Sequence, residues 1–216
     1  MRKRRIILAY HNPVIKFYCL VRFIIIRINI LEKFSEPLRQ FTSGHVLDVG
    51  CGFGLFAIYN ATRHPGLTIH GVDYNRRRIA EALAVSRRLR VDNVRFRVGD
   101  VRRLDPEVRH FKVIYMLDIL HHIPVVSKYR LLRKCHRLLE DDGLLVIKDI
   151  DTGNRLKVAF TWLLDKLMGP VDAVSYQSSL KLQRMLEYCG FEVTRRELID
   201  DILPYPHMVL LCRKRA

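Results

Sequence analysis

The chain lacks paired cysteines. Its five cysteines form no C-x-x-C pair and lie mostly inside apolar segments. An odd count without a framework spacing argues against a disulfide-stapled secreted fold and favours reduced core thiols in the cytoplasm. A metal-ligand pattern is also missing, because His121 and His122 are adjacent and neighbouring side chains cannot easily point at one ion. We therefore expect a cytoplasmic protein without a bound metal.

Acidic residues are scarce. The 216 residues include 22 Asp and Glu against 38 Lys and Arg, which gives a net charge of +16. Such an excess attracts polyanions, meaning nucleic acid or an anionic membrane surface, although each basic cluster can also be a solvated surface. Repeats and low-complexity tracts are absent, and a hydrophobic content of 49% is ordinary for a folded protein. The length suits one α/β domain with an extension.

An apolar run long enough to span a membrane is missing from residues 1–40. Lys16, Arg22 and Arg27 interrupt the segment, and no small-residue cleavage site follows it. Wound as a helix, it aligns one apolar stripe that consists of Phe17, Leu20, Val21, Ile24, Ile28 and Leu31. We expect this stripe to be buried, most simply against the sheet. Apolar residues off the stripe leave three other roles open: a lid over a greasy substrate, a homodimer interface, or a peripheral contact with the inner membrane face.

The most informative motif that is present runs from Val46 to Phe56. An apolar run ends at Asp48, and glycines then occupy the alternate positions Gly50, Gly52 and Gly54. The apolar run predicts a buried strand, and the glycines allow a sharp turn and the close approach of a ligand. A helix that begins near Phe53 would present its N-terminal N–H groups to that ligand. The motif therefore predicts a nucleotide-like binding element.

The spacing of these glycines narrows the choice of ligand. Dinucleotide sites carry G-x-G-x-x-G, whereas this loop reads G-x-G-x-G with Asp48 two residues ahead of it. An acid inside the loop is unfavourable beside a pyrophosphate but suits a ligand with an ammonium and a sulfonium group. S-adenosylmethionine carries both, and a hydride-transferring dehydrogenase is disfavoured.

Apolar strands alternate with helical segments through the rest of the chain. We predict strands at 45–49, 67–72, 94–98, 112–117 and 143–150, helices at 75–90, 125–139 and 177–189, and a closing antiparallel hairpin of 191–198 and 207–213. This alternation predicts a doubly wound, mostly parallel α/β sheet with right-handed crossovers. Residues 151–175 break the rhythm and are predicted to be an insertion on the substrate side of the main domain, which spans 41–216.

Acids lie at the carboxyl ends of four of the predicted strands, at Asp48, Asp73, Asp100 and Asp118. Ligands of open α/β sheets bind at the carboxyl ends of the strands. Asp73 lies 19 residues after Gly54, close to the spacing at which an acid binds ribose hydroxyls, and Asp100 is placed to accept the exocyclic amine of adenine. Any one of these acids could be a turn residue or a helix cap, but the set of four favours a nucleotide site.

This ordered set of motifs resembles the class I S-adenosylmethionine-dependent methyltransferases over residues 45–213. The matching stretches are Asp48–Gly54, Gly71–Asp73, Gly99–Asp100, Asp118–Ile123 and Asp141–Leu145. The resemblance implies a seven-stranded sheet with the last strand antiparallel, and S-adenosylmethionine as cofactor. It places Gly50, Gly52 and Gly54 around the methionine portion, Asp73 on the ribose, Asp100 on the adenine and Val101 against its ring; Asp48, Tyr74 and Leu117 complete the expected cofactor contacts. Cys51 is then a small residue at a close approach rather than a nucleophile.

Methyl transfer is a displacement at an electrophilic carbon, so the protein mainly aligns the reactants and excludes water. A base is needed only when the acceptor is protonated. Asp118, His121 and His122 follow the fourth strand, where the family's substrate meets the methyl group, and an imidazole there could take a proton. Packing or capping is the alternative role for both histidines. Weaker pocket candidates are Tyr10, His11, Tyr18, Tyr176 and Tyr205.

The methyl acceptor is less well defined by the sequence. The Leu120–Ile123 stretch and the small size look most like family members that act on small molecules, including quinone precursors and lipids. Together with the apolar N-terminal segment, this favours an aromatic or lipid-like acceptor. RNA is the alternative because of the net charge of +16. Against RNA, the chain lacks an appended RNA-binding module, and Asp118–His121 does not match the Asn/Asp-Pro-Pro-aromatic tetrad of base-amine methyltransferases. A non-catalytic cofactor-binding protein is a third possibility.

Overall fold

The computed structural model describes residues 3–25, 34–153, 158–159, 162, 175–200 and 206–215. The strands are β1 (Gly44–Val49), β2 (Leu67–Asp73), β3 (Val94–Val98), β4 (Phe111–Leu117), β5 (Leu139–Ile150), β6 (Phe191–Asp200) and β7 (Pro206–Lys214). The longer helices are α1 (Lys3–Leu8), α2 (Pro13–Ile25), α4 (Leu55–Arg63), α5 (Arg76–Leu89), α6 (Val125–Leu138) and α8 (Ser179–Tyr188). Short 3-10 turns are η1 (Glu36–Gln40), η2 (Val101–Arg103) and η3 (Leu120–His122).

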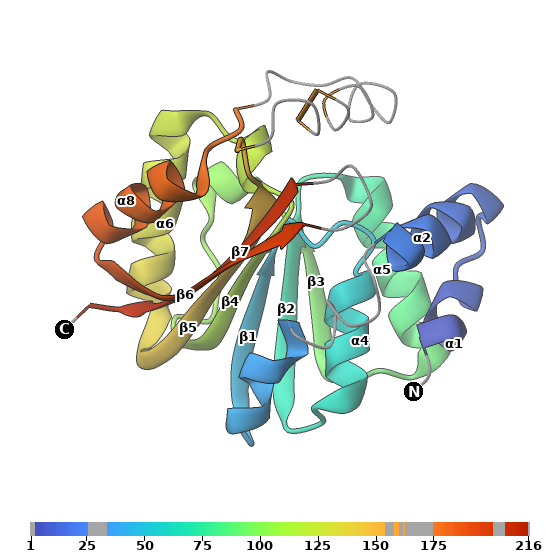
Figure 1. Cartoon of the computed structure of the whole chain (residues 1–216). Helices are drawn as coiled ribbons and strands as arrows, with labels where there is room; N and C mark the ends of the chain where they lie inside the picture. Colours follow the sequence, from blue (N-terminus) through green and yellow to red (C-terminus); the bar gives the residue numbers. More distant parts are fainter. Residues whose placement is uncertain are drawn as a thin grey trace.

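The seven strands form one sheet in the order β3-β2-β1-β4-β5-β7-β6 (Figure 1). Strands β1 to β5 pair in parallel, and β7 runs antiparallel to both β5 and β6. The expected doubly wound α/β sheet with an antiparallel last strand is therefore confirmed. The chain first builds outward from β1 to β3 and then crosses back to β4, so the strand order reverses between β1 and β4.

The predicted strands and helices are all present, with small shifts at their ends. Helix α5 begins one residue later than expected, because the side chain of Asn75 accepts hydrogen bonds from the N–H groups of the first turn and caps the helix. The largest shift is in β5, which begins at Leu139 rather than Gly143. Leu139 already pairs with Phe111 ahead of a register irregularity in the ladder between β4 and β5. A bulged ladder of this kind lets a strand extend through a glycine.

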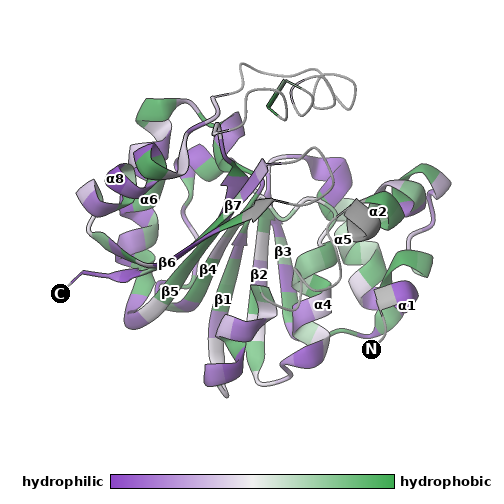
Figure 2. Ribbon diagram, viewed as in Figure 1, coloured by the Kyte–Doolittle hydropathy of each residue, from purple (hydrophilic) through white to green (hydrophobic). Residues whose placement is uncertain are grey.

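The two faces of the sheet are covered by different helices. Helices α6 and α8 pack on one face, over a core that includes Ile114, Leu132 and Leu186. Helix α4 packs on the other face, over a core that includes Val46 and Tyr115. The central strands β1, β2 and β4 are largely apolar, whereas the edge strand β6 carries many hydrophilic residues (Figure 2). A charged side chain that is buried within the sheet needs a specific partner.

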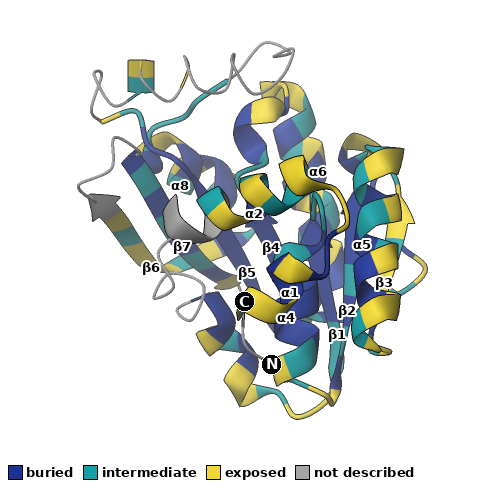
Figure 3. Ribbon diagram, turned by 90° about the vertical axis from the view of Figure 1, so that its right-hand side faces the viewer, coloured by how far each residue is buried: buried dark blue, intermediate teal, exposed yellow. Residues whose placement is uncertain are grey.

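Helices α1 and α2 form an additional layer outside α4 and α5 (Figure 3). Ile6, Tyr10 and Cys19 are buried there against Ile58 and Tyr59 of α4. Helix α2 begins at Pro13, after a break in which Asn12 accepts hydrogen bonds from the N–H groups of the next turn. The N-terminal segment is thus attached to the helix that follows the glycine loop.

The expected burial of the N-terminal apolar stripe is wrong for two of its members. Phe17 is 67% exposed and Leu20 is 44% exposed, whereas Cys19, off the stripe, is buried. The rotation of α2 is set by Tyr18 and Cys19, which face the core cluster over α4. The side chains of Ile24, Ile28 and Leu31 lie outside the described residues, as do Tyr205 and most of the 151–175 segment.

None of the helices in the described ranges is long and apolar enough to cross a membrane. The five cysteines all lie in described positions as thiols rather than disulfides, and all but Cys51 are buried. Four of the five thiols therefore lie in the core, where they were expected.

Candidate functional site

The candidate cofactor site lies at the carboxyl ends of β1, β2 and β4, where the strand order reverses. Parallel pairing brings these ends to one edge of the sheet (Figure 1). In open α/β folds this reversal opens a crevice for ligands. The acids Asp48, Asp73, Asp100 and Asp118 are all in or just beyond strands that end at this edge, as predicted.

The glycine loop is built almost entirely from backbone geometry. Gly50, Gly52 and Gly54 have φ angles of +76°, +56° and +74°, in the left-handed region that side chains disfavour. The N–H of Gly50 donates to the carbonyl of Val72 at 2.8 Å, which ties the loop to the end of β2. Gly54 is the N-cap of α4. The helix therefore begins at Leu55, two residues later than expected, and its first N–H groups follow the loop directly.

A side chain added at two of these glycines would collide with the protein. A Cβ at Gly54 would lie 2.5 Å from Cζ of Phe96, and one at Gly50 would lie 2.8 Å from the side chain of Ile119. A Cβ at Gly52 would meet nothing within 4 Å. Gly52 therefore borders open space at the apex of the loop.

Asp73 holds this loop in place. Its Oδ2 accepts a hydrogen bond from the N–H of Gly52 at 2.9 Å, and its Oδ1 accepts one from the N–H of Asn75 at 2.9 Å. A carboxylate has about four acceptor positions, so lone pairs remain for the two hydroxyls of a ribose. The position of Asp73 fits the predicted ribose contact.

Asp48 and Cys51 lie close to Asp73. Asp48 is 2% exposed. Burial, followed by the negative charges of Asp48 and Asp73, raises the pKa of the Cys51 thiol well above its ordinary value. Cys51 is thus neutral at physiological pH, which fits a residue at a close approach rather than a nucleophile.

The other predicted cofactor residues lie around the ends of β2, β3 and β4. Asp100 accepts hydrogen bonds from the N–H of Arg102 and from its guanidinium, at 2.8 to 3.0 Å, and this partner lowers the pKa of the Asp100 carboxyl. Val101 is buried in the core, and Tyr74 is 67% exposed. Leu117, half-buried, packs against the core on the α4 face. All four residues therefore lie near the edge of the sheet formed by the carboxyl ends of the parallel strands, where they were expected.

After β4, Asp118 forms an ion pair with a buried lysine that was not predicted from the sequence. Lys148, 2% exposed on β5, places its ammonium 2.7 Å from both carboxylate oxygens of Asp118. The backbone of Asp118 is left-handed, with φ of +57°, and its N–H donates to the carbonyl of Lys148 at 2.8 Å. The ion pair and the backbone bond fix the start of the segment that follows β4.

His121 is fixed by a second acid from β5, Asp149. Nδ1 of His121 lies 2.6 Å from Oδ1 of Asp149, and the N–H of His121 donates to the other carboxylate oxygen at 3.1 Å. Because Asp149 accepts from Nδ1, the neutral imidazole keeps its proton there and leaves Nε2 as the basic atom. Both side chains are buried, whereas His122 is exposed, its ring centroid 4.0 Å from that of His121. The ring of Tyr176 lies 5.5 Å from that of His121.

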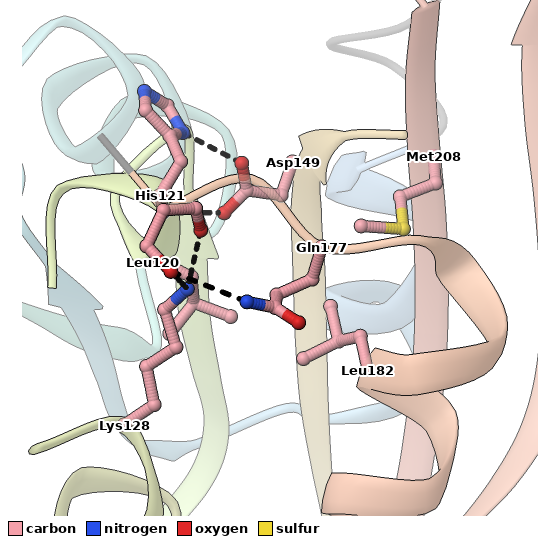
Figure 4. Close-up of a pocket in the computed structure, with 8 residues that line it drawn as sticks. Leu120, His121, Lys128, Asp149, Gln177, Leu182 and Met208 are labelled. Atoms are coloured by element: carbon pink, nitrogen blue, oxygen red, sulfur yellow. Dashed lines mark hydrogen bonds and ion pairs between the residues drawn. The ribbon is translucent and has the colours of Figure 1, made fainter. Parts of the chain in front are cut away.

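A small pocket lies behind this pair (Figure 4). Lys128 is 1% exposed, and its ammonium donates to the carbonyl of Ser175 at 2.6 Å. Burial lowers the pKa of Lys128, against the raising effect of Asp149. With a cavity volume of about 10 Å³, the pocket is no larger than a site for a single water molecule. We interpret it as a polar network that supports the segment after β4.

Sequence reasoning missed Lys128, Lys148 and Asp149. A signal for the last two was present, because charged residues at 148 and 149 interrupt the apolar run that predicts β5. A charge inside a buried strand needs a partner. Only the tertiary structure identifies those partners, which lie 28 and 30 residues earlier in the chain.

Two of the weaker pocket candidates, Tyr10 and Tyr18, cover the glycine loop from the N-terminal segment. The hydroxyl of Tyr10 donates to the carbonyl of Phe53 at 2.7 Å, and the ring centroid of Tyr18 lies 5.5 Å from that of Phe53. His11 contacts Arg88 of α5 instead. The N-terminal segment therefore contacts the cofactor loop directly.

Comparison with curated proteins finds small-molecule methyltransferases. The ubiquinone biosynthesis O-methyltransferase of Coxiella burnetii (strain RSA 493 / Nine Mile phase I) is 28% identical over 119 residues, which cover 55% of this chain and 49% of that protein. The (S)-coclaurine N-methyltransferase of Papaver somniferum is 26% identical over 124 residues, or 57% of this chain and 34% of that protein. The chain thus spans about half the length, or less, of these relatives.

Comparison with solved structures shows the same fold at low sequence identity. The magnesium protoporphyrin IX methyltransferase from Synechocystis PCC 6803, solved with bound SAH, has a TM-score of 0.69 at 19% identity, over 98% of this chain and 93% of that one. A protein named as a [4+2]-cyclase has a TM-score of 0.72 at 16% identity, over 87% of this chain and 81% of that one. The fold alone therefore does not identify the reaction.

The family is identified by sequence. A family profile described as a methyltransferase domain matches residues 26–196, which is most of the chain. That range includes the glycine loop, the acids at the strand ends and the histidines after β4. The chain belongs to the class I S-adenosylmethionine-dependent methyltransferases, and S-adenosylmethionine is its cofactor.

Proposed function

We propose that this protein transfers the methyl group of S-adenosylmethionine to a small hydrophobic, aromatic or lipid-like acceptor. The observation that carries the proposal is the loop of three left-handed glycines, held by Asp73 and open at Gly52, beside the segment that carries Asp118 and His121. The names of the curated relatives, one an O-methyltransferase of ubiquinone biosynthesis and one an N-methyltransferase of coclaurine, support an acceptor of small-molecule size.

On this proposal, backbone groups of the glycine loop bind the methionine portion of the cofactor. Asp48 offers its negative charge to the ammonium, and Asp73 accepts the ribose hydroxyls. Asp100 accepts the adenine amine once its contact with Arg102 is shared or released, since that contact occupies both carboxylate oxygens. Val101, Tyr74 and Leu117 flank the same bound cofactor. S-adenosylmethionine supplies an electrophilic methyl group, and the protein orients it and excludes water.

For an acceptor that carries a hydroxyl proton, we assign His121 as the base. Asp149 fixes the tautomer and orientation of the imidazole, so that Nε2 can take the proton as the methyl group is transferred. Asp118, held by Lys148, then sets the backbone position of this segment rather than acting as a base. His122 is exposed beside His121 and is assigned to the mouth of the acceptor site.

Cofactor binding is tested by calorimetry with S-adenosylmethionine and its demethylated product. Asp73→Ala should weaken binding by about 10–100-fold, the loss expected when hydrogen bonds to a charged group are removed. Asp92→Ala, which removes an exposed carboxylate in the turn before β3, is the matched control and should bind like the wild-type protein. Equal affinity of the two variants would contradict the assigned site.

The acceptor is tested by incubating the protein with methyl-labelled cofactor and separate lipid and RNA extracts. Label in molecules that partition into organic solvent supports the proposal. Label in RNA would instead indicate an RNA methyltransferase, the alternative that rests on the net charge of +16. Cofactor binding without transfer to either extract would favour a non-catalytic protein.

The role of His121 is tested with the acceptor that this assay identifies. His121→Ala should lower kcat by about 10²–10⁴-fold, the range typical of general bases, whereas His122→Ala should affect KM more than kcat. Asp149→Asn should move the acid limb of the pH–rate profile toward lower pH, because the imidazole loses a neighbouring negative charge. An unchanged profile would leave Asp149 a purely structural residue.

We further propose that residues 1–40 form an extension to the main domain and residues 151–175 a substrate-side insertion. Because the proposed acceptor is apolar, we also propose that the protein is cytoplasmic and contacts the membrane peripherally. A truncation to residues 41–216 that still binds the cofactor would support the division, and one that fails to fold would argue against it.

A further inference from the structure

An exposed apolar surface lies on the outer side of α1 and α2. We call it the α1–α2 surface; it consists of Leu8, Val14, Phe17 and Leu20, which are 71%, 72%, 67% and 44% exposed. The three members on α2 are spaced three residues apart and share one side of the helix. The opposite side of α2 carries Cys19, which is buried against α4. In Figure 3, helices α1 and α2 lie in front of α4 and carry exposed positions.

Basic residues lie on the same two helices as the α1–α2 surface. Arg4 and Arg5 are exposed on α1, and Lys16 is half-buried on α2, beside the apolar members. Residues 1–31 contain no Asp or Glu. Several exposed apolar side chains on one short segment, next to several cations, are unusual on a surface that faces only water. The surface therefore fits a partner that is both apolar and anionic.

An anionic lipid bilayer matches both properties. Its interface buries apolar side chains to a depth of ~5–10 Å, and each nearby basic residue contributes about 1 kcal/mol. A second copy of this chain would bury the apolar residues but bring Arg4, Arg5 and Lys16 against their own symmetry mates, because a twofold interface is self-complementary. RNA would engage the cations and leave the apolar side chains in water. We propose that the α1–α2 surface is a docking site for an anionic lipid bilayer.

The N-terminal segment is anchored on its inner side to the glycine loop. Tyr10 donates to the carbonyl of Phe53, and Arg88 of α5 donates to the carbonyl of Ala9. Tyr10 is fully buried in this contact. A bilayer bound to the α1–α2 surface would therefore lie close to the cofactor loop, which suits an acceptor dissolved in lipid. The docking itself does not depend on the proposed function, because adsorption to lipid requires no methyl transfer.

Vesicle flotation with the full-length protein tests the proposal. Vesicles of phosphatidylcholine alone are compared with vesicles that also contain phosphatidylglycerol. We expect binding to the anionic vesicles that weakens as salt is raised. The double variant Phe17→Gln with Leu20→Gln should bind at least about tenfold more weakly, since each side chain loses its burial in the interface. Arg4→Glu with Arg5→Glu should abolish the preference for anionic lipid.

The matched controls are Leu180→Gln, which changes a 57% exposed leucine on α8, and Arg130→Glu, which reverses an exposed charge on α6. Both should bind vesicles like the wild-type protein, and circular dichroism and cofactor affinity report folding of every variant. Equal binding by Phe17→Gln with Leu20→Gln and by Leu180→Gln would overturn the proposal. The proposal would also be overturned if the wild-type protein bound no vesicles and formed a dimer in light scattering that Phe17→Gln with Leu20→Gln dissociates. Loss of vesicle binding with unchanged cofactor affinity would support docking whatever the outcome for the methyl acceptor.

Discussion

The two ends of the candidate site are built from different parts of the polypeptide. The cofactor end is a backbone structure, in which three left-handed glycines and one carboxylate, Asp73, set the path of the chain. The proposed acceptor end is a side-chain structure, in which Lys148 and Asp149 of β5 hold Asp118 and His121. A backbone site suits a ligand that is common to a family, whereas a site held by side chains can change with few substitutions. Under the proposed function, this contrast would let one fold keep its methyl donor while the acceptor changes.

Removing Lys148 should give the largest effect on stability, at the acceptor end. Lys148→Met leaves the partly buried Asp118 carboxylate without its ammonium partner, and removal of one member of a buried pair costs up to about 3–5 kcal/mol in the free energy of unfolding. Urea denaturation measures this loss. The double variant Lys148→Met with Asp118→Asn should recover much of it, because no uncompensated charge remains. If the double variant is as unstable as the single one, charge is not what holds this end together.

A pair of glycine substitutions tests the cofactor end. Gly54→Ala combines a left-handed backbone with a Cβ 2.5 Å from Phe96, so we expect a loss of about 2–4 kcal/mol in unfolding free energy. Gly52→Ala has only the backbone cost of about 1–2 kcal/mol but should weaken cofactor binding at least about tenfold, since its methyl group enters the open space. Denaturation and calorimetry separate the two effects. A Gly52→Ala protein with normal affinity would show that this space is not used by the cofactor.

The smallest expected effect is a pH dependence of the free energy of unfolding that originates at His70. Burial, with smaller contributions from His45 and Arg95, lowers the pKa of His70 from 6.5 to about 4. Between these values the unfolded chain binds a proton that the folded chain does not, so stability falls as pH drops from about 6.5 to about 4. Because His70 is only half-buried, we expect a loss of roughly 1–2 kcal/mol.

His70→Gln should remove part of this pH dependence, as measured by urea midpoints at pH 7 and pH 5. His110→Gln, at an exposed position before β4, is the control and should retain the wild-type dependence. An equal slope in all three proteins would remove His70 from the explanation. The variants at both ends of the site are therefore best compared above pH 7, where this histidine is neutral in the folded and the unfolded chain.

Most of the fold and the cofactor end could be predicted from sequence because their signals are local. Apolar runs, alternate glycines and acids at strand ends lie within a few residues of one another, and β3 matches its predicted bounds of Val94–Val98. The acceptor end is not local. The partners of Asp118 and His121 lie 30 and 28 residues later, and only the pairing of β4 with β5 brings them together.

The orientation of α2 was unpredictable for a different reason. The helix is apolar on more than one side, so periodicity alone could not select the buried side. Tyr10 and Tyr18 make that selection by packing on Phe53, a residue that is distant in sequence. The result is the reverse of the expectation at Phe17 and Leu20, which face outward.

The hydrogen bond from Tyr10 to Phe53 joins the N-terminal segment to the glycine loop. Suppose that bound cofactor tightens the glycine loop and so stabilises the docked position of Tyr10. Any partner that holds the N-terminal segment in this position must then strengthen cofactor binding by the same factor, because linkage between equilibria is reciprocal. Tyr10→Phe, which keeps the ring and removes the hydroxyl, should uncouple the two. The Tyr10 hydroxyl would then link binding at the outer surface of the N-terminal segment to binding of the methyl donor.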